Sequence, residues 1–448
     1  MSVRRSLALA RWLMPGLGVK RWLLLSLLGA ALFVNGLNRY LVDEGVALRI
    51  NETVDWLVND FLPPSLLAPV FMVAGALLVG LGIWRWLSSI LAAVGSGGRS
   101  TGMIDAILQR RLERGYKIVV VGGGTGLSTM LRGLKRTTTN LTAVVTVSDD
   151  GGSSGRLQKE LGVLPPGDIR NCLVALADDE ALVTELFRYR FAEGEGLSGH
   201  SFGNLFLAAM TGITGNFDEA IKVSSRVLNV KGRVLPATLA VARLCARLVD
   251  GRVVEGESHI TGARGVIEEV YLDPPGALPL DEVITAIREA HAIVLGPGSL
   301  YTSIMPNLLV ERIAHEIEAA SAVKIYVCNV MTQPGETDGY TAAAHVRAIT
   351  RHTGAHLIDV AVVNDELPRK LRDQYAEEEQ YPVDVDEEEL RELGVRVVRA
   401  GVISETNTVR HDPERLANVV LSIIDEAVQQ RATYVRMRGS NTSPAPTA

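Results

Sequence analysis

The sequence predicts an α/β protein with a mainly parallel sheet, preceded by two transmembrane helices. Three observations support this fold class. Between residues 117 and 430, short hydrophobic runs alternate with helical patterns, the first run ends in a glycine-rich loop, and two apolar stretches almost free of charge occur in the first hundred residues. Such alternation is typical of right-handed βαβ units, whose ligands bind beyond the carboxyl ends of the strands.

Residues 1–95 are predicted to form a membrane hairpin. Residues 22–38 and 66–83 each approach the length that a helix needs to cross a bilayer. Basic residues without any acid precede the first stretch, whereas acids outnumber arginines between the two stretches. Because cationic flanks stay inside the cell, we expect a two-pass protein of the cell membrane with both ends of the chain cytoplasmic. A cleaved signal peptide and a buried core hairpin are the alternatives.

The remaining chain divides into three parts. Residues 96–116 are predicted to be a linker and a helix, because a glycine- and serine-rich joint precedes a helical pattern around residues 104–114. Residues 117–430 form the main domain, and residues 431–448 lack hydrophobic periodicity and are predicted to be a disordered tail. Within the domain we expect strands at 292–296, 324–330 and 356–364 and helices at 280–291, 308–322 and 340–350.

A glycine-rich loop after the first strand indicates the chemistry of this domain. Residues 117–128 read KIVVVGGGTGLS. Glycine lets backbone N–H groups approach an anion, and the helix that follows directs its positive end at the same point, so we expect a phosphate there. Gly122 and Gly124 match the start of a dinucleotide fingerprint, but Leu127 stands where the third glycine belongs. An ordinary tight turn is the alternative.

A second loop opens with two adjacent acids, Asp149 and Asp150. They are candidates for binding Mg²⁺ or ribose hydroxyls. A joint metal site requires the turn to begin between them, because adjacent side chains of an extended strand point apart. Four further polar loops lie at 165–173, 199–206, 296–304 and 329–340. Each alone is compatible with an ordinary turn or helix cap, but their number favours one common ligand site.

The composition excludes several classes of protein. A net charge of -6 and a pI of about 5.9 over 448 residues do not suggest a nucleic-acid binder. The three cysteines, Cys172, Cys245 and Cys328, lie far apart, so neither a disulfide framework nor a zinc site is indicated. Cys172 and Cys328 fall in apolar contexts and are expected to be small core residues.

Seven motifs follow one another between residues 117 and 430. They are GGGTGLS (122–128), SDDGGSSGRL (148–157), PPGDIRNCLVAL (165–176), GHSFGNLFLAAM (199–210), GPGSLYTSIMPNLLV (296–310), NVMTQPGET (329–337) and VRHD (409–412). In this order they resemble the gluconeogenesis factor family, the YvcK-like branch of the CofD-like proteins. The resemblance implies a Rossmann-related CofD-like fold. The hydrophobic hairpin lies outside it, and the familiar soluble members lack such an extension.

The resemblance also implies two alternative functions. The first is a regulatory protein that binds a nucleotide sugar such as UDP-N-acetylglucosamine and acts on cell shape and cell-wall synthesis during gluconeogenic growth. The second is a CofD-type transferase that moves a phospholactate group from a guanylylated donor with a divalent metal. No cofactor is certain, and Mg²⁺ is the candidate. A nicotinamide oxidoreductase rests on fold analogy alone. Expected partners are the nucleotide sugar, the inner membrane, cell-wall synthesis proteins and a second copy of the chain.

Candidate ligand-binding residues follow from these motifs. The set comprises Gly122, Gly123, Gly124, Thr125, Gly126, Ser128, Asp149, Asp150, Asp168, Asn171, His200, Ser201, Asn204, Gly298, Ser299, Leu300, Asn329, Thr332, Gln333 and Arg410. The first loop is expected to hold phosphate, residues 171 and 200–204 sugar or base, and residues 298–300 a second anion nest. Arg410 is a candidate clamp on the diphosphate or a solvated arginine. Asp168 is also a candidate helix cap, and His200 the candidate base if the protein is an enzyme.

Overall fold

The structure is a computed structural model that describes residues 19–41, 64–94, 110, 112–178, 180–368, 371–405 and 408–440. The chain divides into two compact units, Met1–Arg111 and Leu112–Ala448. The predicted joint at 95–101 and most of the predicted helix at 104–114 lie outside the described residues.

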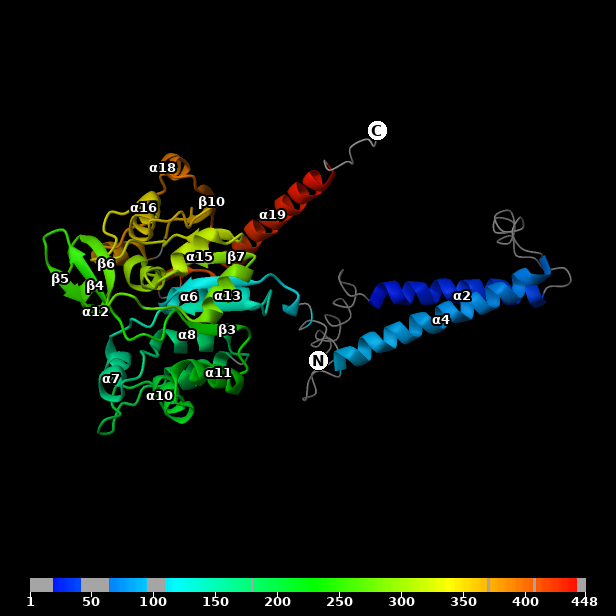
Figure 1. The fold of residues 1–448 in the computed structure, drawn as a ribbon, viewed down its shortest axis with the longest axis horizontal. Coiled ribbons are helices and arrows are strands. Elements are labelled where there is room, and N and C mark those ends of the chain that lie inside the picture. Colours follow the sequence, from blue (N-terminus) through cyan, green and yellow to red (C-terminus); the bar gives the residue numbers. More distant parts are fainter. Residues whose placement is uncertain are drawn as a thin grey trace, which may run out of the picture. The chain divides into compact units, whose positions relative to one another are not determined.

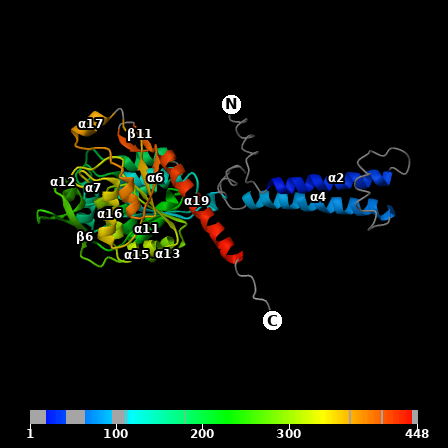
Figure 2. The same cartoon turned by 90° about the horizontal axis from the view of Figure 1, so that it is seen from above.

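The first unit contains two helices that lie side by side, α2 (Val19–Leu41) and α4 (Pro64–Val94) (Figures 1 and 2). Glycines allow the close approach. A Cβ atom on Gly75 would lie 2.5 Å from the backbone nitrogen of Phe33, and one on Gly29 would lie 2.8 Å from the Cβ of Leu78. Small residues at such a contact are typical of helices that associate in lipid, where backbone proximity replaces the hydrophobic effect as the source of packing energy.

Large apolar side chains cover the outer faces of the two helices. They are Leu24, Leu27, Leu28, Val34, Val70, Val73, Leu77, Leu81, Ile83 and Trp84. Within α4, Ala68–Arg85 is long and apolar enough to cross a membrane, whereas α2 contains only a shorter apolar stretch, Leu24–Leu37. The structure therefore has helices at both predicted spans, and the crossing of a membrane by two helices stays a prediction.

The second unit is built on a seven-stranded sheet in which every neighbouring pair is parallel. In spatial order its strands are β10 (Arg396–Ala400), β9 (Val360–Asn364), β8 (Val323–Val327), β7 (Ala292–Leu295), β1 (Ile118–Gly122), β2 (Leu141–Val145) and β3 (Arg233–Pro236). The three strands predicted from hydrophobic runs are β7, β8 and β9. They are buried on both faces, which explains why their sequences are continuously apolar.

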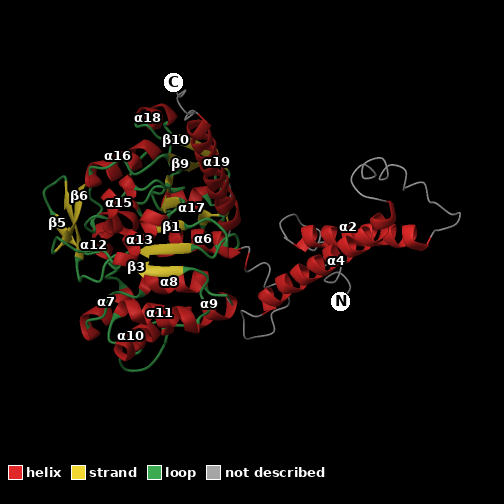
Figure 3. Cartoon of the chain, turned by 45° about the vertical axis from the view of Figure 1, so that its right-hand side comes forward, coloured by secondary structure: helices red, strands yellow, loops and turns green. Residues whose placement is uncertain are grey.

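Helices cover both faces of this sheet (Figure 3). Along β1 the side chains alternate: Ile118 and Val120 pack with one set of helices, and Val119 and Val121 with the other. The first set contains α6 (Gly124–Leu134), α8 (Gly167–Leu176), α10 (Phe202–Thr214), α11 (Phe217–Val227) and α19 (Pro413–Ser440). The second contains α13 (Asp281–Glu289), the π-helix η1 (Leu300–Ile304), α14 (Met305–Leu308), α15 (Ile313–Ala319) and α16 (Ala342–Thr353).

Two small antiparallel sheets are inserted into this framework. The larger one, which the hydrophobic pattern does not predict, contains β5 (Val253–Glu255), β4 (Arg243–Leu248) and β6 (Ile267–Asp273), with the short helix α12 (Glu257–Gly262) between β5 and β6. The other pairs β11 (Ile403–Glu405) with β12 (Val409–His411). Four short helices complete the described part: α7 (Gly152–Leu161), α9 (Glu180–Arg188), α17 (Arg372–Glu377) and α18 (Glu387–Glu392).

The carboxyl-terminal segment differs from the prediction. Helix α19 continues to Ser440, so residues 431–440 are helical rather than part of a disordered tail. Arg431, Ala432 and Met437 are good helix formers, and they extend a helix that Leu416, Val420 and Ile424 already anchor on the sheet. Residues 441–448 lie outside the described residues.

Candidate functional site

The order of the strands places a topological switch point between β1 and β7. The chain runs outward from β1 through β2 to β3 on one side and from β7 to β10 on the other, so the loops after β1 and β7 diverge at this point. In open parallel sheets such a switch point, at the carboxyl ends of the strands, is where ligands bind. The two loops touch here, because a Cβ atom on Gly126 would lie 2.4 Å from the carbonyl oxygen of Pro297.

The loop after β1 presents the positive end of helix α6. Gly123 precedes the helix in extended conformation, and Gly124 adopts a φ of +64°, a left-handed conformation that favours glycine. The residue before the helix provides no side-chain cap. The buried carboxylate of Asp168 accepts a hydrogen bond from the N–H of Gly124. An acid of the protein therefore already lies at the place where an anion is expected, in the first turn of α6.

Asp168 opens helix α8 and is almost fully buried. Burial raises the pKa of its carboxyl group to about 6, and the nearby charge of Asp149 adds to this, while the hydrogen bond from Gly124 opposes it. No side-chain hydrogen bond caps α8. Asp168 is therefore not a simple N-cap of α8. Its carboxylate contacts the glycine loop instead.

The adjacent acids Asp149 and Asp150 contact different neighbours. Asp149 Oδ1 accepts the N–H of Gly151 at 3.0 Å, whereas Asp150 Oδ1 accepts the N–H of Ser258 at 3.0 Å, in the first turn of α12. In the part of the chain that the structure describes, no three Asp, Glu, His or Cys side chains are grouped so that they could hold a metal ion. The protein alone therefore does not build a closed metal site around these two acids.

An arginine connects the residues expected to bind sugar or base. Arg170 Nη1 donates to Ser201 Oγ at 2.8 Å and to Asn204 Oδ1 at 2.9 Å, and its Nη2 donates to Asn171 Oδ1 at 2.9 Å. Asn204 Nδ2 in turn donates to Ser153 Oγ at 3.2 Å. The guanidinium thus links the amino-terminal turns of α8 and α10. Sequence reasoning missed Arg170, although it is the only basic residue in its motif.

His200 lies in the same network. Its Nδ1 is 2.9 Å from Ser153 Oγ at the start of α7, and the residue is buried. Burial, followed by the positive charge of Arg156, lowers the pKa of its imidazole. A neutral histidine that contacts a buried serine is suited to positioning α7 against α10.

The loops after β7 and β8 are also joined. Gln333 Nε2 donates to Ser299 Oγ at 2.7 Å, and Asn329 Nδ2 donates to Gln333 Oε1 at 3.2 Å. Thr332 is paired with Tyr381 through both its groups: its N–H donates to the Tyr381 carbonyl oxygen at 2.7 Å, and its hydroxyl accepts the Tyr381 N–H. The side chain of Leu300 lies in the hydrophobic core. The π-helix η1 begins directly after this contact, a geometry often found at functional sites.

The remaining predicted residues lie around this edge. Ser128 Oγ donates to the carbonyl oxygen of Gly124 within α6 and is buried. Gly298 lies near the loop after β1, since a Cβ atom on it would be 3.4 Å from the carbonyl oxygen of Gly123. Arg410 lies on the β11–β12 hairpin, which packs through Val409 on the loop after β8. Its side chain is exposed and has no ion pair with any residue in the described ranges.

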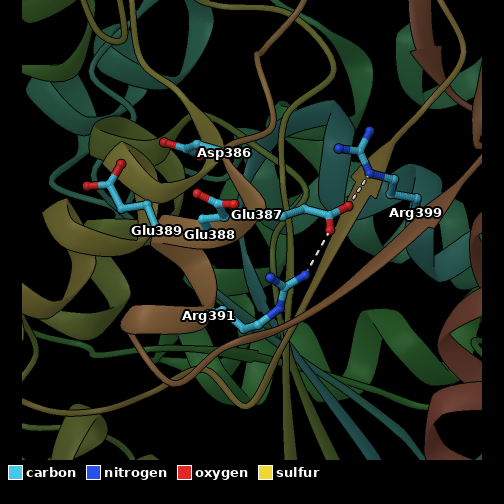
Figure 4. A pocket seen from close by; sticks show the side chains of 6 residues that line it. All are labelled: Asp386, Glu387, Glu388, Glu389, Arg391 and Arg399. Carbon is cyan, nitrogen blue, oxygen red and sulfur yellow. Dashed lines mark hydrogen bonds and ion pairs between the residues drawn. The ribbon is translucent and has the colours of Figure 1, made fainter.

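Two pockets elsewhere on the domain contain none of these residues. One, of about 640 Å³, is lined by residues on and around α18 (Figure 4): Asp386, Glu387, Glu388, Glu389, Arg391 and Arg399. Glu387 there pairs with both arginines. The other, of about 250 Å³, lies at the amino-terminal end of β1 and β2. We place the candidate site at the carboxyl edge because open parallel sheets bind ligands there.

The fold and this edge define a doubly wound α/β protein with a glycine-rich loop at the switch point of the sheet. Its main unit matches the family model of the 2-phospho-L-lactate transferase CofD over residues 118–403. The gluconeogenesis factor of Bacillus subtilis is 53% identical over 69% of this chain and 98% of its own length. The chain therefore belongs to the CofD-like gluconeogenesis factor family.

Two further relatives differ in which units of this chain they match. A Nostoc sp. relative is 51% identical over 92% of this chain and 91% of its own length, so the match necessarily includes helix α4. A crystal structure of a Bacillus halodurans protein, 50% identical with a TM-score of 0.67, covers 69% of this chain and 100% of its own chain. A protein limited to the main unit therefore folds, and an amino-terminal extension is shared by at least one longer relative.

Proposed function

We propose that this protein binds a nucleotide diphosphate sugar of the UDP-N-acetylglucosamine kind and acts as a regulator of cell shape and cell-wall synthesis under gluconeogenic growth. The observation that carries the proposal is the meeting of the glycine loop after β1 with the loop after β7 at the switch point. The first turn of α6 favours a phosphate, which would replace the Asp168 carboxylate at the N–H of Gly124. The Arg170 network at the start of α8 and α10 lies at the same edge of the sheet, where its amide and hydroxyl side chains would have to exchange partners to bind a sugar or base.

We further propose that α2 and α4 anchor the domain at the inner membrane as a two-pass hairpin, with the large domain in the cytoplasm. The apolar outer faces of both helices support this. Enzymes that use lipid-linked wall precursors work at the same membrane surface. A regulator anchored there diffuses in the same membrane plane as these partners. We also propose that the chain associates with a second copy of itself, although no contact in the described part of the structure supports this.

A transferase of the CofD type is the second candidate, because the family model and the acids at the site both favour it. Mg²⁺ commonly binds through one or two carboxylates together with substrate phosphates. Asp149 and Asp150 each accept a backbone N–H through Oδ1, and a carboxylate bound in this way can still offer Oδ2 to a cation. When bound, the ion would neutralise charge on the transferred phosphoryl group.

Calorimetric titration of residues 112–448 separates the two functions. The ligands are UDP-N-acetylglucosamine, UDP-glucose, GDP and NAD, each with and without Mg²⁺. Tight binding of a UDP-sugar without turnover supports the regulator. Binding of GDP that depends on Mg²⁺ and on Asp149 or Asp150 supports the transferase, and binding of NAD alone contradicts both.

A further inference from the structure

Two glutamates that the sequence motifs do not single out each have a buried carboxylate oxygen without a hydrogen-bond partner among the residues that the structure describes. These atoms are Glu257 Oε2 and Glu336 Oε2. Glu336 is 5% exposed, and its other oxygen accepts hydrogen bonds from Thr261 Oγ1 at 3.0 Å and Thr302 Oγ1 at 3.2 Å. One oxygen of Glu336 therefore has two donors, whereas its other oxygen and Glu257 Oε2 have no partner among the described residues.

Both glutamates lie at the candidate site. Glu257 begins α12, where the next residue, Ser258, donates its N–H to Asp150. Glu336 belongs to the loop after β8 and contacts η1 through Thr302. The pKa of Glu257 is raised well above its ordinary range, first by burial and then by the charges of its neighbours Asp168, Asp149, Glu336 and Asp150. A Cβ atom on Gly256, next to Glu257, would lie 1.9 Å from Asp150 Oδ2, and one on Gly167, next to Asp168, would lie 2.5 Å from Asp149 Oδ2, so these carboxyl groups form one acidic cluster.

This arrangement destabilises the empty protein. An unpartnered buried polar group costs about 1–3 kcal/mol, and more when it is charged. The charged neighbours with the largest effect on Glu257 are all acids, and the pKa of Glu336 is raised by burial while hydroxyl and backbone donors oppose the shift. Unfavourable groups of this kind persist in binding sites, where a ligand supplies the missing partner.

We propose that Glu257 and Glu336 are ligand-binding residues that accept hydrogen bonds from the O–H and N–H donors of the sugar in the bound nucleotide sugar. The inference rests on the proposed function and names the part of the ligand that these residues recognise. A carboxylate offers only acceptors, which matches the hydroxyl and amide donors of a sugar ring. A site that depends on such donors strongly rejects a ligand without them.

This assignment gives the three-stranded sheet of β5, β4 and β6 a role in ligand binding. This small sheet carries Glu257 on α12 to the edge of the main sheet, and the contact between Asp150 and Ser258 holds it there. The phosphate loop and the sugar-binding acids therefore come from different parts of the fold. Loss of one is expected to leave the other intact.

The first test uses the ligand-free protein, residues 112–448. Glu257→Gln and Glu336→Gln each replace a buried acid, whose carboxyl pKa burial raises, with a neutral amide of the same shape, so we expect the melting temperature at pH 7.5 to rise by about 2 °C or more. The matched control is Glu316→Gln on α15, because that buried carboxylate is paired with Arg288 at 2.5 Å and Arg312 at 3.3 Å and its loss lowers the melting temperature. A lower melting temperature in both site variants overturns the inference.

The second test compares UDP, UDP-glucose and UDP-N-acetylglucosamine in the presence of EDTA. Each glutamine variant is expected to weaken UDP-sugar binding by about 10-fold or more, the value of one charge-assisted hydrogen bond, and to leave UDP within about twofold. An equal loss for UDP and the UDP-sugars overturns the sugar assignment. Unchanged variants overturn it while the proposed function stands. A wild-type protein that binds none of the three overturns both.

Discussion

Asp168 shows how a single residue at the site couples charge to stability. Its carboxyl pKa is about 6 in the folded protein against an ordinary value of 3.8, mainly because of burial. Between these values the folded state binds more protons than the unfolded state, so stability falls as the pH rises from 3.8 to 6. The two values correspond to about 3 kcal/mol of destabilisation at neutral pH.

Asp168→Asn is therefore expected to stabilise the ligand-free domain at pH 8. The amide keeps an oxygen that accepts the N–H of Gly124 and carries no buried charge. The gain should shrink below pH 6 and disappear near pH 4, where the wild-type carboxyl is protonated. Denaturant unfolding at pH 8, 6 and 4 measures the difference. A gain that does not vary with pH would contradict the assignment of the charge to Asp168.

His411 has the opposite effect. Burial lowers the pKa of its imidazole from 6.5 to about 4. The contribution of His411 to the free energy of unfolding is fully present above pH 6.5 and is lost as the pH falls to 4. The loss is about 3 kcal/mol. His411→Asn should remove most of this acid sensitivity in unfolding experiments between pH 7 and pH 4.5. His315→Asn, at an exposed position on α15, is the control and should change the pH profile little.

At the scale of elements, the contact between α6 and the loop after β7 depends on Gly126. A Cβ atom there would meet the Pro297 carbonyl at 2.4 Å, and backbone cannot move aside cheaply. Gly126→Ala is expected to lower stability by about 1–3 kcal/mol and to weaken ligand binding, as measured by unfolding and calorimetry. Gly212→Ala is the control. Gly212 is an exposed helical glycine in α10 with open space around it, so alanine should stabilise the helix slightly.

The helix pair of the first unit makes a similar prediction. Gly75→Leu places a side chain where the backbone of Phe33 lies, whereas Gly80→Leu projects into open space. We expect Gly75→Leu to separate α2 from α4 and Gly80→Leu to leave them paired. Disulfide trapping between cysteines introduced at Ser26 and Gly82, which lie in contact, reports the pairing in membranes. Equal trapping in both variants would contradict this packing.

At the scale of the whole molecule, the two units are expected to have separate roles. The Bacillus halodurans structure shows that a chain limited to the main unit folds. Residues 112–448 should therefore stay in the soluble fraction and bind ligand as the full chain does, while the full chain fractionates with the inner membrane. Full complementation of a deletion strain by residues 112–448 would show that the anchor is dispensable for regulation.

The parallel sheet, the glycine loop after β1 and the apolar character of the first unit are predictable from the amino-acid sequence. These features are local, because buried strands are continuous apolar runs and a phosphate-type turn needs only a few adjacent residues. The folded structure was needed to show that the strand order reverses between β1 and β7, that Arg170 joins α8 to α10, and that Glu257 and Glu336 belong to the same cluster as Asp168. Such contacts join segments far apart in the chain, and the packing that brings them together leaves no periodic trace in the sequence around each residue.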